Sequence, residues 1–169
     1  MKEEYFDIYD DAGNRIGKAL RSECHGNPAL LHRTAHVVVI HPETGDILLQ
    51  KRKMTKDIQP GKWDTAVGGH LDAGEDYLTG AKRELAEELG ITGCVELEWL
   101  FTEKVRNDIE SEDTGVFALR HAGPFKFQES EIDDLKFWSK EELADENNRQ
   151  LFTPLLRQEL DKLREINLI

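Results

Sequence analysis

The segment from Gly69 to Ile91 constrains the fold more than any other part of the sequence, because glycines bracket a long stretch of helix-favouring residues. The turn-forming pair Ala73-Gly74 precedes that stretch, and we expect a helix from about Asp76 to Leu89. Gly90 is expected to end the helix, because glycine readily adopts the left-handed conformation found just beyond a helix C-terminus. The sequence therefore predicts a helix held between two glycine turns near the middle of the chain.

Three glutamates share one face of this helix. Glu84, Glu87 and Glu88 stand at positions i, i+3 and i+4, which places their side chains on the same side. Like charges at these spacings destabilise an isolated helix by roughly 0.2–0.5 kcal/mol per pair. Converging carboxylates suit a hard divalent cation such as Mg²⁺. The alternative is an acidic face turned to solvent, which is the better interpretation of E-x-x-E-E taken without its context.

The residues around these glutamates resemble the signature of the Nudix hydrolases, G-x5-E-x7-R-E-U-x-E-E-x-G-U, where U is a bulky aliphatic residue. A chance match to so many positions is much rarer than a match to a lone glycine-rich loop. Every defined position is filled, by Gly69, Glu75, Arg83, Glu84, Leu85, Glu87, Glu88, Gly90 and Ile91.

The resemblance implies both a fold and an activity. The fold is the α/β Nudix sandwich, an α/β/α arrangement with a mixed β-sheet. The activity is metal-dependent hydrolysis, in which water attacks phosphorus in a nucleoside diphosphate linked to another moiety or in a related small molecule. Mg²⁺ or Mn²⁺ would be bound by the three helix glutamates and Gly69. Glu75 and Arg83 would be structural, as an ion pair that braces the loop before the helix.

The general base stays open among three carboxylates. A metal-binding carboxylate, Glu87 or Glu88, is favoured to take the proton from water. Glu131, which lies just before an expected strand, is the candidate outside the box.

Three residues near the box are candidates for substrate binding. Arg52 and Lys56 would contact phosphate, and the alternative that they are solvated cations at a strand end is equally supported. Trp63 would stack on a base, although tryptophan in a P-G-x-W loop is more often part of the core.

Outside the box, most of residues 5–160 resembles the isopentenyl-diphosphate-isomerase branch of the Nudix superfamily. The resemblance implies a second divalent metal, and histidine with glutamate is a reasonable ligand set for Mn²⁺ or Zn²⁺. Each histidine taken alone is better explained by a hydrogen bond to a loop. The residues at the metal-binding positions of the isomerases are His25, His32, His70, Glu110 and Glu112.

Two departures from the isomerases bear on the chemistry. Gly68 stands where the isomerases have a catalytic cysteine, and Leu155 where they have a tryptophan that steadies a carbocation. Glycine cannot transfer a proton and leucine offers no π face to a cation. A hydrolase is therefore favoured over an isomerase-like enzyme, and a non-catalytic binding module would have no need of the intact carboxylates.

Length and charge limit the partners. One domain is expected over residues 1–169, with the box at residues 69–91. The formal net charge of −12 disfavours nucleic acid and anionic membranes, so the expected partner is a small-molecule diphosphate, with a homodimer left open. The N-terminus lacks the regions of a signal peptide, and Cys24 and Cys94 have no C-x-x-C spacing. A cytoplasmic protein with reduced cysteines is expected.

The remaining secondary structure follows from hydrophobic alternation and turn residues. A capping box at Ser139 predicts a short helix, and Thr153 before Pro154 predicts a C-terminal helix to about Glu165. The expected strands are Tyr5 to Tyr9, Arg15 to Leu20, Thr34 to Ile40, Ile47 to Arg52, Trp63 to Val67, Val95 to Val105, Gly115 to Arg120 and Leu135 to Trp138.

Overall fold

The computed structural model describes residues 3–169. Met1 and Lys2 lie outside the described residues, and they belong to the N-terminal segment in which no signal peptide is expected. In order along the chain, the elements are β1 (Tyr5–Tyr9), β2 (Arg15–Leu20), α1 (Arg21–Cys24), β3 (Leu31–Ile40), β4 (Ile47–Arg52), β5 (Trp63–Thr65), β6 (Val67–His70), α2 (Tyr77–Leu89), β7 (Glu98–Arg106), β8 (Ser111–Arg120), β9 (Ile132–Trp138), α3 (Lys140–Ala144), α4 (Glu146–Arg149) and α5 (Pro154–Glu165).

A seven-stranded mixed sheet forms the centre of the molecule. Its main path runs β5-β4-β3-β8-β7, with β6 also paired to β3 and β9 to β4. β3 and β8 are parallel and in register over their whole length, from Leu31 opposite Ser111 to Ile40 opposite Arg120. β1 and β2 form a separate antiparallel hairpin.

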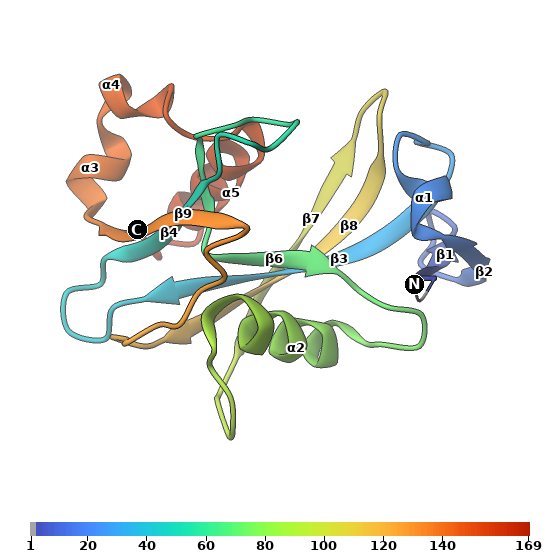
Figure 1. Ribbon diagram of the computed structural model, residues 1–169, viewed down its shortest axis with the longest axis horizontal. Coiled ribbons are helices and arrows are strands. Elements are labelled where there is room, and N and C mark those ends of the chain that lie inside the picture. Colours follow the sequence, from blue (N-terminus) through green and yellow to red (C-terminus); the bar gives the residue numbers. More distant parts are fainter. Residues whose placement is uncertain (1–2) are drawn as a thin grey trace.

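Helices cover both faces of the sheet, as the expected α/β/α sandwich requires. Along β3, Ala35, Val37 and Val39 pack with the apolar side of α2, while Val38 and Ile40 pack with the α5 side. Figure 1 shows α2 on one side of the sheet and α3, α4 and α5 on the other. Side chains that alternate along one strand therefore enter two different layers.

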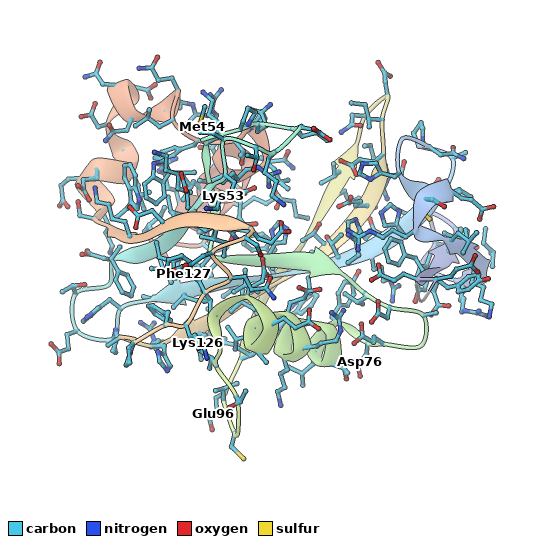
Figure 2. The ribbon with its side chains drawn as sticks, in the orientation of Figure 1. Lys53, Met54, Asp76, Glu96, Lys126 and Phe127 are labelled. Carbon is cyan, nitrogen blue, oxygen red and sulfur yellow. The ribbon has the colours of Figure 1, made fainter. Side chains whose placement is uncertain are left out.

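The box helix begins and ends at the expected residues. The Asp76 side chain accepts a hydrogen bond from Thr79 N, and Gly90 adopts the left-handed conformation with φ 68°. The Lys126 amide donates to the Leu89 carbonyl, and Figure 2 shows Lys126 beside the end of α2 opposite Asp76.

Several boundaries differ from the sequence prediction. The single strand expected from Trp63 to Val67 is two strands, because Ala66 carries the chain from the edge of β4 to the edge of β3. β8 begins at Ser111 rather than Gly115, since its polar first residues pair with β3. Within residues 3–169, none of the helices combines the length and apolar character needed to cross a membrane.

Candidate active site

The box carboxylates of α2 lie against the glycines of β6. A Cβ atom on Gly69 would stand 2.2 Å from Cδ of Glu84, so only glycine leaves room for that carboxylate. Glu88 Oε2 accepts a hydrogen bond from Gly68 N at 3.0 Å, and its Oε1 lies 3.5 Å from Gln50 Nε2. The side chain of Glu87 is 52% exposed, so the three carboxylates extend from the buried sheet edge to solvent.

Burial disfavours negative charge on the inner two carboxylates. It raises the pKa of Glu88 to about 8, with a further contribution from the charge of Glu84. Burial also raises the pKa of Glu84, although Arg83 opposes the shift. A divalent cation would offset both the burial and the mutual repulsion, so this donor set fits Mg²⁺ or Mn²⁺.

Arg83 connects the loop before the helix to the site. Its Nε and Nη2 each donate to Glu75 at 2.8 Å, and Nη2 also donates to the His70 carbonyl at 2.9 Å. Its Nη1 donates to Glu84 at 2.8 Å. These hydrogen bonds from Arg83 lower the pKa of Glu75. The guanidinium therefore fixes β6, the loop and one box carboxylate relative to each other.

A second group of donors lies where the starts of β3 and β8 meet the end of β6. Glu112 Oε1 is 3.5 Å from His32 Nε2 and 3.4 Å from His70 Nε2. The two imidazoles stack on each other at 5.2 Å, and Phe6 stacks on both. The hydrogen bonds of both histidines hold the pKa of Glu112 well below its usual range despite burial.

Two residues expected in this second group are placed differently from the other three. Glu110 contacts Glu112, and that contact together with burial raises the pKa of Glu110 to about 7. His25 is exposed at the end of α1, outside the compact group of His32, His70 and Glu112.

The expected substrate-binding side chains have protein partners. The Lys56 ammonium pairs with the exposed carboxylate of Glu131, the candidate base outside the box. Arg52 Nε donates to the Ile58 carbonyl at 3.1 Å. Trp63 packs edge-on against Trp138 at 5.2 Å in the α5-side core, in agreement with the core interpretation of this tryptophan.

Sequence reasoning missed a third group of polar side chains, His36, Glu103 and Glu159, which are all buried. The available signal was the alternation of His32, Thr34 and His36 along β3, which puts a polar row on one face of a strand whose second half is apolar.

Comparison with known proteins identifies the family. The NUDIX domain model matches residues 30–158. An uncharacterised Nudix hydrolase of Yersinia pestis is 37% identical over 145 residues, covering 83% of this chain and 76% of the relative. The Nudix hydrolase YfcD of Escherichia coli K12 is 34% identical over 145 residues, covering 83% of this chain and 77% of the relative.

Solved structures share the fold. A Deinococcus radiodurans protein superposes with a TM-score of 0.73 at 22% identity, covering 94% of this chain and 98% of that one. A MutT protein of Methanosarcina mazei gives a TM-score of 0.67 at 21% identity, covering 83% and 97%. The matched domain and the relatives of similar length agree with the box and its geometry, and the chain belongs to the Nudix hydrolase family, whose domain hydrolyses diphosphate-containing substrates.

Proposed function

We propose that the protein hydrolyses a diphosphate linkage in a nucleoside diphosphate derivative or related small molecule, at the carboxylates of α2. The observation that carries the proposal is the position of the box carboxylates. The Glu84 carboxylate packs directly against Gly69, and the Glu88 carboxylate accepts a hydrogen bond from Gly68 N. This arrangement collects three acidic side chains beside a backbone edge and leaves Glu87 open to solvent.

The chain's own residues divide the work. Glu84, Glu87 and Glu88, with Gly69, would hold Mg²⁺ or Mn²⁺. Bound there, the ion neutralises the diphosphate and polarises a P–O bond. Either Glu87 or Glu88 would take the proton from water. Glu87 is the more accessible of the two, whereas Glu88 already accepts the Gly68 amide. Glu131 is the third candidate, and its pairing with Lys56 keeps a cation beside it.

Glu87→Gln tests the assignment. The change keeps the shape and removes one exposed charge, so we expect turnover to fall by about two orders of magnitude with little change in melting temperature. Phosphate release from nucleotide and isoprenoid diphosphates would be measured with Mg²⁺ and with Mn²⁺. Glu96→Gln is the matched control, because Figure 2 shows Glu96 in the loop beyond α2. Near-normal turnover of Glu87→Gln on every hydrolysed substrate would contradict the assignment.

We also propose a second divalent ion, such as Mn²⁺ or Zn²⁺, at His32, His70 and Glu112, with Glu110 adjoining. Support comes from the convergence of two imidazoles on one carboxylate oxygen. Elemental analysis of protein purified without chelator should show one transition-metal equivalent less in His32→Ala than in wild type. His25→Ala tests whether that exposed residue also contributes. Equal metal content in His32→Ala and wild type at micromolar Mn²⁺ or Zn²⁺ would return these residues to a structural role.

The isomerase-like scaffold, the single-domain organisation and the cytoplasmic location belong to the same proposal. Cys24 is buried and Cys94 exposed, and both are free thiols. The partner is a small diphosphate rather than nucleic acid, which the net charge of −12 repels. A homodimer stays open to a measurement of mass in solution. Isomerase activity and a purely binding role are the alternatives, and substrate turnover separates both from hydrolysis.

A further inference from the structure

A buried polar group lies between the sheet and α5, on the opposite face of the sheet from α2. His36 projects from β3, Glu103 from β7 and Glu159 from α5, and each is at most 6% exposed. His36 Nδ1 is 2.6 Å from Glu159 Oε2. One donor atom from each side chain lies within 4.8 Å of the others. Three elements distant in sequence thus bring one nitrogen and two carboxylates to a single point.

The burial of the Glu103 carboxylate is not explained by packing of the fold alone. It is 0% exposed, and within residues 3–169 neither carboxylate oxygen has a hydrogen-bond partner that meets the geometric criteria. Burial and the charge of Glu159 disfavour its charged form, and these effects outweigh those of His36, Lys162 and Gln158, which favour it. A buried carboxylate without partners is strongly unfavourable, and such groups in native proteins are protonated, paired with a cation or bound to a metal.

We propose that His36, Glu103 and Glu159 form a binding site for a divalent transition-metal ion of the Zn²⁺ type. Imidazole nitrogen with carboxylate oxygen is a donor set that such ions accept. Two ligands about 2.1 Å from a common ion stand at most about 4.2 Å apart. The donor atoms therefore need to move by less than about 1 Å to reach an ion between them.

Charge also favours the proposal. A neutral imidazole with two carboxylates carries a charge of −2, which a divalent ion cancels. Without the ion, neutrality requires a proton shared by His36 and Glu159 and a second proton on Glu103. The ion takes the place of both protons, so both are released when it binds. The three side chains and the ion together are then neutral, and both carboxylates have a partner.

The site is separate from the two groups described above. On the same face of the sheet, the hydroxyls of Thr34 and Thr114 bond to each other at 2.6 Å, between this group and His32 with Glu112. A Cβ atom on Gly68 would lie 2.9 Å from Cδ2 of His36, so the backbone of β6 covers the imidazole. An ion here would join α5 to β3 and β7, which suits a structural cross-link.

Zinc content is the first test. The full chain would be stripped with EDTA, reloaded with Zn²⁺, passed through gel filtration and analysed for zinc per protein. Glu103→Gln should bind one zinc equivalent less than wild type. Glu98→Gln, an exposed glutamate on the same strand, should bind as many as wild type. The difference between these variants is independent of the other metal sites. Equal zinc content in Glu103→Gln and wild type would overturn the proposal.

The His36 imidazole gives a second readout that does not depend on replacing an acid. ¹⁵N NMR of the ring, assigned with His36→Gln, should show a change in the Nδ1 resonance of wild type when Zn²⁺ is added, and no such change in Glu103→Gln. If the shift is the same in both proteins, or is absent from wild type, the site does not bind zinc. Far-UV circular dichroism establishes that each variant is folded.

Discussion

Glu103→Gln should stabilise the metal-free protein at alkaline pH, although it replaces a fully buried residue. Burial first, and the charge of Glu159 second, raises the pKa of Glu103 from 4.5 to about 7. A carboxyl with a raised folded-state pKa contributes most to stability below its unfolded pKa, here about 4.5. That contribution is lost as the pH rises through about 7. Glutamine has nearly the same shape and does not titrate.

The magnitude follows from the size of this shift. A difference of about 2.5 pKa units corresponds to about 3 kcal/mol in the free energy of unfolding. Ionisation of Glu103 destabilises wild type by this amount at pH 8, and most of the effect is absent at pH 5. For a chain of this size, about 3 kcal/mol moves the melting temperature by about 6–12 °C. The proton held by His36 and Glu159 is present in both proteins, so it largely cancels from the comparison.

Thermal unfolding in EDTA, followed by circular dichroism at pH 5 and pH 8, measures the effect. We expect Glu103→Gln to melt well above wild type at pH 8 and near it at pH 5. Glu98→Gln, whose side chain is exposed, should follow wild type at both pH values. A variant that melts below wild type at pH 8, or whose advantage does not change with pH, would refute the reasoning about this buried acid.

The remaining predictions concern the box and its alternatives. Gly69→Ala should displace the Glu84 carboxylate and lower turnover by about tenfold or more, with a small change in melting temperature. Gly17→Ala is the control, because a Cβ atom on Gly17 would meet no atom of the described residues within 4 Å. Equal turnover in the two variants would contradict the close contact between Gly69 and Glu84. Arg83→Ala should lower the free energy of unfolding, measured in urea, by about 2–4 kcal/mol, because it leaves the partly buried Glu75 and Glu84 without their cation. A loss below about 0.5 kcal/mol would show that the ion pairs are solvated. The protein should not catalyse deuterium uptake into isopentenyl diphosphate in D₂O, because Gly68 and Leu155 offer no proton donor and no aromatic face; enzyme-dependent exchange abolished by Glu112→Gln would identify an isomerase.

Local signals predicted α2 well because its ends are determined within a few residues. Asp76 caps the first turn and Gly90 takes up the left-handed conformation, and neither requires a distant partner. The caps at Ser139 and Thr153 likewise start α3 and α5. Where a helix begins and ends by its own hydrogen bonds, the sequence was sufficient.

The polar layer under α5 could not be predicted in the same way. Glu103 and Glu159 occur in segments that alternate like ordinary solvated elements, and only the pairing of β7 with β8 and the packing of α5 bury them. The sequence prediction placed the start of β8 too late for a related reason. Glu112 and Thr114 are polar, but β3 and its neighbours bury them. Burial of a charged residue depends on the tertiary fold, which hydrophobic periodicity does not report.

The parallel pairing of β3 with β8 also determines when the protein can gain its sites during synthesis. Thr34 and Thr114 bond across 80 residues of sequence, so the two central strands meet only after a long loop has closed. Contacts of such sequence separation form slowly, and the entropy of closure must be overcome before they contribute to stability. A nascent chain that ends before Ser111 carries the complete box but lacks β8, and therefore the Glu112 carboxylate that His32 and His70 approach. We infer that the box helix can form early, whereas the histidine group is completed only when β8 has left the ribosome.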